Sequence, residues 1–128
     1  MTGITESSIM LVEDNMNLQE SIIELLSYRG FHNITAFNDG FKAVTYCKTY
    51  SPDLAILDVE VHGLNGLDTL IELHSMKPTL PVIMMSSQLD KHVIIQACES
   101  GASTFFPKPF DSEMFCCKID ALLQKVVF

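Results

Sequence analysis

The sequence is short of positive charge. It has 8 lysine and arginine residues against 16 aspartate and glutamate residues, for a formal net charge of −8. A protein that binds nucleic acid directly needs a basic surface that displaces counterions from the phosphate backbone. The composition therefore argues against direct binding to nucleic acid or to an anionic membrane. It suits a divalent cation if some of the acids converge.

Long hydrophobic runs are also absent. The longest apolar stretches have only a few residues, whereas a helix that crosses a bilayer needs about 20. Residues 1–8 contain neither the basic region nor the apolar segment of a signal peptide, and we expect them to be a flexible N-terminal segment. The expected location is therefore the cytoplasm.

The cysteines form no Cys-x-x-Cys pair, and no histidine stands at zinc-ligand spacing from Cys47, Cys98, Cys116 or Cys117. We interpret them as reduced thiols. Hydrophobic residues make up 48% of the 128 residues, which is too many for a disordered segment and enough for a buried core. One domain over residues 1–128 is the expectation.

Five short hydrophobic runs predict five β-strands, and a helical pattern follows each of them. Several runs are almost continuously apolar, which is typical of strands that a parallel sheet buries on both faces. The predicted strands are Ile9–Val12, Ile34–Phe37, Leu54–Leu57, Val82–Met85 and Thr104–Phe106.

The first predicted helix lies between an N-cap, Asp14 or Asn15, and Gly30, which can end it in a left-handed conformation. The other predicted helices are about Asp39–Tyr50, Leu67–Met76, Leu89–Ser100 and Ser112–Val126, the last with Asp111 as its N-cap. This (βα)5 alternation predicts an α/β fold, a doubly wound, five-stranded parallel sheet with strand order 2-1-3-4-5.

Polar side chains stand at the ends of four predicted strands, and these ends should meet at one edge of the sheet. They are Glu13 and Asp14, Asp58, Ser86 and Ser87, and Lys108. Three neighbouring carboxylates repel one another unless a cation lies among them, and Mg²⁺ prefers such oxygen ligands. With the metal and Lys108 present, a carboxylate can attack a phosphoryl group while Ser86 donates to one of its oxygens.

Each of these residues also has an ordinary structural explanation when it is taken alone. An acidic pair can cap a helix, an aspartate before a glycine-rich loop can serve a turn, and a loop lysine can simply be solvated. Their coincidence at four strand ends favours the functional interpretation, which is the formation of an aspartyl phosphate.

Six short motifs surround these strand ends: Ile9–Asn15, Leu57–Glu60, Gly63–Gly66, Pro81–Ser86, Gly101-Ala102 and Pro107–Phe110. As a set they resemble the receiver domain of bacterial two-component response regulators, over about residues 9–126. The resemblance implies a flavodoxin-like sheet. It also implies a signalling domain that is no enzyme beyond its own phosphorylation and slow autodephosphorylation.

The resemblance implies a role for each site residue. Asp58 would accept a phosphoryl group from a histidine kinase or a histidine phosphotransfer protein, in a reaction that needs Mg²⁺ or Mn²⁺. The metal ligands would be Glu13, Asp14, Asp58 and the backbone carbonyl of Glu60. Lys108 would pair with the phosphoryl group, and its peptide bond to Pro109 would be cis.

A conformational switch is implied as well. Ser86 matches the switch hydroxyl group that binds a phosphoryl oxygen, and Phe105 falls at the aromatic switch position that rotates inward on phosphorylation. Glu60 and Gln88 occupy the two positions that tune the lifetime of the aspartyl phosphate. We hypothesise that Glu60 repels or positions the water that attacks it.

The sequence departs from the family pattern at several positions. His62 stands where proline is usual, and we interpret it as a surface loop histidine, with a titratable group near the site as the alternative. Ser87 stands where a small residue such as alanine is usual. Ser103-Thr104 before Phe105, and a last helix without arginine, argue against one charge-paired dimer of the family. A phosphorylation-dependent homodimer of another kind stays open.

Two other functions stay open at this point. The chain could be a phosphate-independent interaction module. Less expected is a small phosphatase, because Asp58-Val59-Glu60 superficially resembles the Asp-x-Asp motif of haloacid-dehalogenase-type enzymes, although the chain is too short for a cap domain. The downstream effector cannot be read from the sequence, and Val93, Ile94 and Phe115 either contact a partner or pack on the sheet.

Overall fold

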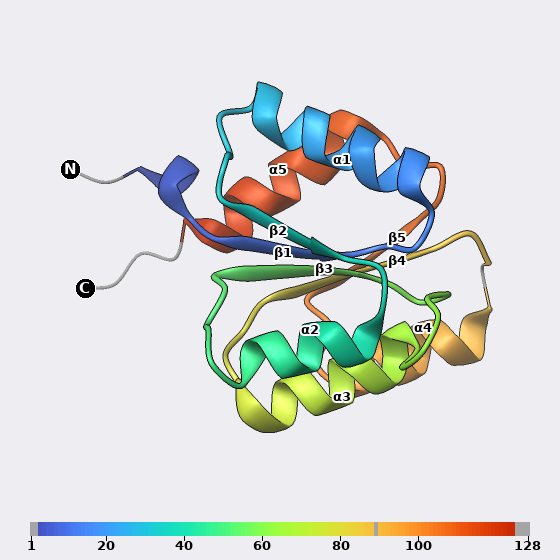
Figure 1. Cartoon of the computed structure of the whole chain (residues 1–128). Helices are drawn as coiled ribbons and strands as arrows, with labels where there is room; N and C mark the ends of the chain where they lie inside the picture. Colours follow the sequence, from blue (N-terminus) through green and yellow to red (C-terminus); the bar gives the residue numbers. More distant parts are fainter. Residues whose placement is uncertain (1–2, 89, 125–128) are drawn as a thin grey trace.

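The computed structural model describes residues 3–88 and 90–124 and has a five-stranded parallel sheet between two layers of helices (Figure 1). The strand order is β2-β1-β3-β4-β5, which confirms the predicted order. The strands are β1 (Ile9–Val12), β2 (Ile34–Phe37), β3 (Leu54–Asp58), β4 (Val82–Ser86) and β5 (Thr104–Pro107). Three strands run one residue further than predicted, so Asp58 and Ser86 are themselves the last residues of their strands.

The helices follow the predicted alternation. They are α1 (Met16–Tyr28), α2 (Gly40–Cys47), α3 (Gly66–Met76), α4 (Lys91–Glu99) and α5 (Ser112–Leu123). The second helix ends at Cys47 and is therefore shorter than the predicted Asp39–Tyr50. Two predicted helix ends, Leu89 and Val126, lie outside the described residues.

Within the described residues, each of these five helices begins at a side chain that accepts a hydrogen bond from the first turn. The N-caps are Asn15, Asp39, Asn65, Asp90 and Asp111. Such a cap satisfies a backbone N–H group that the helix itself leaves without a partner. Because Asn15 rather than Asp14 caps α1, the carboxylate of Asp14 is available to the edge of the sheet.

The two faces of the sheet form two hydrophobic cores, since successive side chains of a strand point to opposite faces. On β1, Met10 and Val12 pack in the core that includes α2 and α3, whereas Ile9 and Leu11 pack in the core that includes α1 and α5. Figure 1 shows α1 and α5 on one side of the sheet and α2, α3 and α4 on the other. The predicted doubly wound fold is therefore confirmed.

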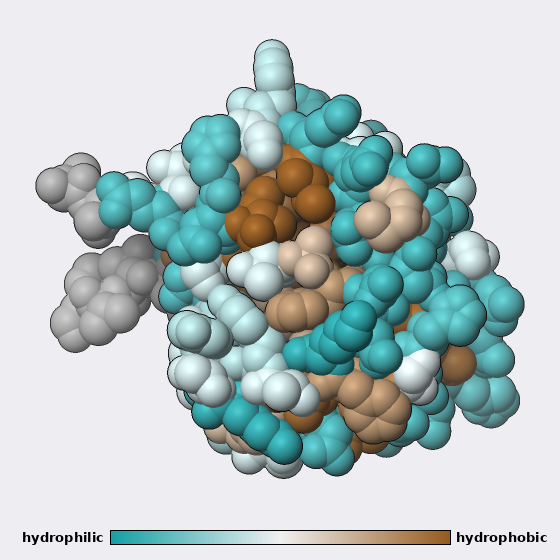
Figure 2. Space-filling model, in the orientation of Figure 1, coloured by the Kyte–Doolittle hydropathy of each residue, from teal (hydrophilic) through white to brown (hydrophobic). Residues whose placement is uncertain are grey.

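At one edge of the sheet, β2 has only one neighbouring strand, and all four of its residues are half-buried. In Figure 2 hydrophobic side chains gather between α1 and β2, whereas much of the rest of that face is hydrophilic. None of the candidate site residues lies on this strand. They come from the ends of β1, β3 and β4 inside the sheet and from the end of β5 at its other edge.

The N-terminal segment that we expected to be flexible has contacts from residue 3 onward. A short 3-10 helix, η1, spans Ile4–Glu6, and Ile4 packs against the core beneath α1 and α5. The backbone N–H group of Ser8 donates to Asp53 Oδ2 over 2.8 Å. Flexibility itself stays a prediction, and residues 1–2 lie outside the described part of the chain.

The start of α3 lies directly against the end of β3. A Cβ atom on Gly66 would lie 2.1 Å from the carbonyl oxygen of Asp58 and 2.6 Å from the Cα atom of Val59. The Gly66 N–H group also donates to the Val59 carbonyl over 3.0 Å. Only a residue without a side chain fits here, so Gly66 lets the helix and the functional strand end approach each other.

We predict that Gly66→Ala destabilises the protein by about 1–3 kcal/mol, because overpacking against backbone atoms cannot be relieved by a side-chain rotation. The clash has to outweigh the better helix propensity of alanine, which favours it by about 1 kcal/mol. Urea denaturation measures the difference. The matched control is Gly3→Ala, where the nearest atom to an added Cβ is Thr5 Oγ1 at 3.7 Å and the change should stay within about 0.5 kcal/mol. Equal stability of both variants would contradict the prediction.

Candidate functional site

The carboxylate of Asp58 lies at the carboxyl end of β3 and is 2% exposed. Its Oδ2 atom accepts a hydrogen bond from Lys108 Nζ over 2.9 Å, and its Oδ1 atom accepts one from the backbone N–H group of Glu60 over 3.1 Å. Both oxygens are therefore oriented by donors from two separate loops.

Glu13 follows the last residue of β1 and is fully buried. Its Oε1 atom accepts a hydrogen bond from Lys108 Nζ over 3.2 Å, and its Oε2 atom accepts one from the Asn15 N–H group over 3.3 Å. The side-chain amide of Gln19 on α1 donates to the Glu13 carbonyl over 2.9 Å. The backbone and the side chain of Glu13 are thus both held in place.

The predicted acidic cluster is present. Glu13, Asp14 and Asp58 each offer a carboxylate oxygen, and these oxygens lie within 4.8 Å of one another. Burial, together with a hydrogen bond to Asp58 and its charge, raises the pKa of Glu13 from 4.5 to about 7, against the opposing effect of Lys108. Burial alone would lower the pKa of Lys108, but hydrogen bonds and charge from Asp58 and Glu13 outweigh it, so the pKa of Lys108 is raised.

The donor set fits a hard divalent cation. All three side chains offer oxygen, which Mg²⁺ prefers, and Asp14 is only half-buried, so the cluster is reachable from outside. Burial is the main cause of the elevated pKa of Glu13, and the charge of Asp58 raises it further while Lys108 opposes the rise.

His62 lies closer to this cluster than the sequence suggested. Its side chain is 90% exposed, as expected of a surface loop residue, but Nδ1 contacts Asp14 Oδ2. The His62 backbone N–H group donates to the same oxygen over 3.2 Å. The interpretation as a mere surface histidine was therefore incomplete, since this side chain orients a predicted metal ligand.

The hydroxyl group of Ser86 lies at the end of β4 but faces Glu60. Ser86 Oγ is 2.5 Å from Glu60 Oε2, and the other carboxylate oxygen of Glu60 accepts hydrogen bonds from Ser87. The backbone N–H group of Gln88 donates to Ser86 Oγ over 3.0 Å. Sequence reasoning placed Ser86 and Glu60 near the site but missed this contact; the one signal for it was the unusual serine at position 87.

Lys108 reaches the acids from the end of β5. Its backbone N–H group donates to the Ser86 carbonyl over 2.7 Å, and the Lys108-Pro109 bond is cis, as the resemblance implied.

Phe105 is half-buried and packs against the core that includes α2 and α3. Phe115 is fully buried, so the prediction that it contacts a partner is wrong. Val93 and Ile94 are half-buried, which is compatible with contact to a partner and with packing on the sheet.

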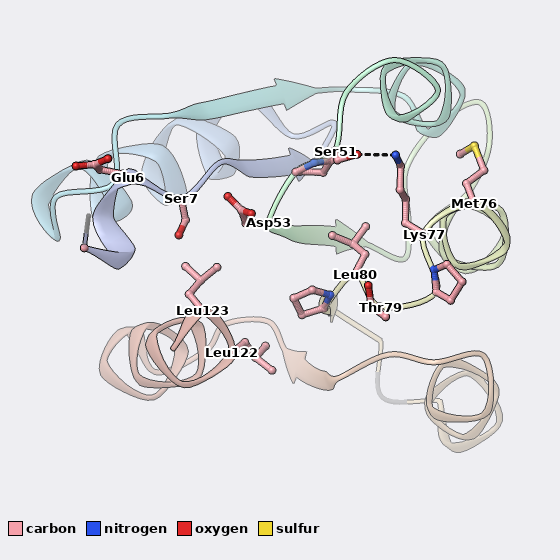
Figure 3. A pocket seen from close by; sticks show the side chains of 14 residues that line it. Glu6, Ser7, Ser51, Asp53, Met76, Lys77, Thr79, Leu80, Leu122 and Leu123 are labelled. Carbon is pink, nitrogen blue, oxygen red and sulfur yellow. Dashed lines mark hydrogen bonds between the residues drawn. The ribbon is translucent and has the colours of Figure 1, made fainter. Parts of the chain in front are cut away.

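A second hollow lies near the amino ends of the strands. This cavity of about 760 Å³ is lined in part by Asp53, Leu122 and Leu123, and by Lys77, whose Nζ atom donates to Ser51 Oγ over 2.6 Å (Figure 3). It contains none of the candidate residues. The candidate residues all lie at the opposite end of the sheet.

Two further expectations concern the rest of the molecule. All four cysteines are free thiols, and burial raises the pKa of Cys47 and Cys116. Among the described residues, no helix has both the length and the hydrophobicity that a membrane crossing requires.

Comparison with known proteins places these features in a family. A model of the response regulator receiver domain matches residues 9–120. The chain is 32% identical over 120 residues to the transcriptional regulatory protein CseB of Streptomyces avermitilis, and 37% identical over 122 residues to the transcriptional regulatory protein CpxR of Klebsiella pneumoniae. These alignments cover 94% and 93% of this chain and 50% of each relative.

Solved structures agree with this result. The receiver domain of NtrX from Brucella abortus is 27% identical and has a TM-score of 0.85. The match covers 93% of this chain and 100% of that one. A CheY-like receiver domain protein from Methanospirillum hungatei has a TM-score of 0.88 at 18% identity, with 94% of this chain and 95% of that one covered, and supports the fold.

The chain therefore belongs to the response regulator receiver domain family, whose members act in two-component signal transduction. It spans about half the length of the curated relatives named above.

The elevated pKa of Glu13 predicts how the stability of the metal-free protein depends on pH. The folded state holds this proton more tightly than the unfolded state, so the free energy of unfolding should fall as the pH rises from about 4.5 to above 7. One pKa unit corresponds to about 1.4 kcal/mol, so a rise from 4.5 to about 7 makes this contribution on the order of 3 kcal/mol.

Urea denaturation at several pH values, with a chelator present, measures this dependence. Glu13→Gln should lack it, whereas Glu72→Gln, at an exposed position on α3, should keep it. A Glu13→Gln variant with the pH profile of the wild type would refute the prediction.

Proposed function

We propose that this receiver domain accepts a phosphoryl group on Asp58 from a histidine kinase or a histidine phosphotransfer protein, with Mg²⁺ or Mn²⁺ bound. The observation that supports the proposal most directly is the position of Asp58. Its carboxylate is buried, lies within an acidic cluster and accepts a hydrogen bond from a lysine. No ordinary structural role requires this arrangement.

In the proposed reaction one oxygen of the Asp58 carboxylate attacks the phosphorus atom as a nucleophile. As this O–P bond forms, the P–N bond to the donor histidine breaks, and the imidazole leaves with the bonding electron pair and takes up a proton. The Glu60 N–H group and Lys108 hold the carboxylate in one orientation, which lowers the entropy cost of reaching the transition state. Glu13, Asp14, Asp58 and the carbonyl of Glu60 would hold the metal. A bound Mg²⁺ would supply positive charge against the transferring phosphoryl oxygens.

Lys108 has a second task in the proposed mechanism. Before transfer its ammonium group balances Asp58 and Glu13, and after transfer it pairs with a phosphoryl oxygen. Ser86 donates to another phosphoryl oxygen, and Phe105 moves with it. The face formed by α4, β5 and α5 then changes what it binds.

Several finer points belong to the same proposal. The chain works as one domain over residues 1–128. Glu60 and Gln88 tune the lifetime of the phosphoryl group, and the chemistry is limited to the chain's own phosphorylation and dephosphorylation.

The partners are a phosphodonor protein and an effector protein or domain of unknown kind. Direct binding to nucleic acid or to a membrane is not expected, whereas a phosphorylation-dependent homodimer is left open. Location in the cytoplasm stays a prediction from the sequence.

One alternative function loses support from the geometry. A phosphatase of the haloacid-dehalogenase type would need the second acid of Asp58-Val59-Glu60 as a general acid over the reacting group. Both carboxylate oxygens of Glu60 instead accept hydrogen bonds from Ser86 and Ser87 at the end of β4. The phosphate-independent module remains the alternative for the experiment to exclude.

The expected result is that the intact protein gains the mass of one phosphoryl group when it is incubated with acetyl phosphate and Mg²⁺. The gain should vanish in Asp58→Ala and in the presence of a chelator, because both the nucleophile and the metal are required. Asp120→Asn on α5 is the matched control and should behave like the wild type.

Absence of any mass gain, with beryllofluoride also failing to bind, would identify a phosphate-independent module. Steady turnover of a phosphomonoester would identify a phosphatase. Each of these results would replace the proposed function.

A further inference from the structure

The Ser86 hydroxyl group is engaged by Glu60 and Gln88. The side chain is 1% exposed, and Oγ donates to Glu60 Oε2 over 2.5 Å while it accepts a hydrogen bond from the Gln88 N–H group. The Gln88 carbonyl, at 3.0 Å, is a second acceptor for the same proton. A hydroxyl group has one proton to donate. A Ser86 that donates to Glu60 therefore cannot also donate to a phosphoryl oxygen.

Ser87 fixes Glu60 in this position. Glu60 Oε1 accepts hydrogen bonds from the backbone N–H group of Ser87 over 3.2 Å and from its hydroxyl group over 3.1 Å. With the Ser86 hydroxyl group, this carboxylate has three donors, all from the end of β4 and the residue that follows it. Hydrogen bonds to an ionised acceptor are about twice as strong as those between neutral groups. An alanine at position 87 would supply only the backbone donor.

Glu60 is also joined to the phosphoacceptor. Its backbone N–H group donates to Asp58 Oδ1, while the neighbouring Val59 N–H group donates to the Met85 carbonyl over 2.8 Å. The loops after β3 and β4 therefore meet at Glu60. A change at Asp58 and a change at Ser86 both act on this one residue.

We propose that Glu60, anchored by Ser87, is a latch that holds the Ser86 hydroxyl group away from phosphate binding in the unphosphorylated protein. The inference rests on the proposed function, since it concerns a phosphoryl group on Asp58. Phosphorylation moves the Ser86 hydrogen bond from Glu60 to a phosphoryl oxygen, and no covalent bond changes in that step. The negative charge of the phosphoryl group also repels Glu60 and so weakens the latch.

A latch of this kind lowers the apparent affinity for phosphoryl groups, because only the released fraction of the protein is competent. Glu60 and Ser87 are positioning residues in this scheme, since they act through Ser86. The hypothesis that Glu60 acts on the hydrolytic water assigns no part to Ser87. The two ideas therefore make different predictions for position 87.

The test is a titration with beryllofluoride, a phosphoryl mimic, in saturating Mg²⁺, followed by amide resonances of the loop after β4. Ser87→Ala should bind about two- to tenfold more tightly than the wild type, because one hydroxyl hydrogen bond of the latch is lost. Its free-state resonances should lie part of the way toward the bound positions. Ser87→Thr keeps the hydroxyl group and should restore wild-type behaviour, and exposed Ser75→Ala on α3 is the matched control.

Glu60→Gln separates the latch from an effect on hydrolysis. A neutral amide is a weaker acceptor, so the latch predicts tighter beryllofluoride binding for this variant as well. The latch is wrong if Ser87→Ala and Glu60→Gln bind with wild-type affinity, whatever happens to the dephosphorylation rate. Failure of the proposed function has another signature, namely a wild-type protein that binds no beryllofluoride and gains no phosphoryl mass.

Discussion

The site depends on one lysine ammonium group that lies between two buried carboxylates. Lys108 Nζ lies 2.9 Å from Asp58 Oδ2 and 3.2 Å from Glu13 Oε1, with only 15% of the lysine side chain exposed. Removing one partner of such a pair leaves an uncompensated buried charge, which is strongly destabilising. Asp14 adds a third acid to the two that Lys108 contacts, so the cluster keeps a negative charge that suits a divalent ion. This imbalance supports the proposed binding of a metal ion and of a phosphoryl group.

The sheet topology makes the contact possible. In the order β2-β1-β3-β4-β5, Lys108 comes from a strand that neighbours neither β1 nor β3, and β4 lies in between. The lysine is carried across the end of β4, where its backbone N–H group bonds to the Ser86 carbonyl. Ser86 therefore supports the backbone from which Lys108 reaches the acids. In the proposed function this contact would link the residue that pairs with the phosphoryl group to the switch residue.

The strands, their order and the membership of the site could be predicted from the sequence, because hydrophobic runs and parallel topology bring Glu13, Asp58 and Lys108 to one edge. The side-chain partners could not. The contact of His62 with Asp14 joins residues 48 positions apart, and that of Ser86 with Glu60 joins residues 26 apart. Such contacts depend on loop conformation and rotamers, which no local pattern specifies. The predicted end of the second helix was also wrong. The residues up to Tyr50 are compatible with a helix, but α2 ends at Cys47.

Four acids lie close together at this site, and each has a proton or a hydrogen-bond partner that reduces the repulsion among them. Glu13 relieves repulsion by holding a proton up to about pH 7, and Asp58 shares Lys108 with it. Asp14 Oδ2 accepts a hydrogen bond from the His62 backbone N–H group and contacts the His62 ring, and Glu60 turns its carboxylate toward Ser86 and Ser87. In the proposed function a metal ion would compete for the carboxylates, and a phosphoryl oxygen would compete for the donors Lys108 and Ser86. The contacts that stabilise the site are thus the ones that the proposed phosphoryl transfer would have to rearrange, as expected where local stability is given up for activity.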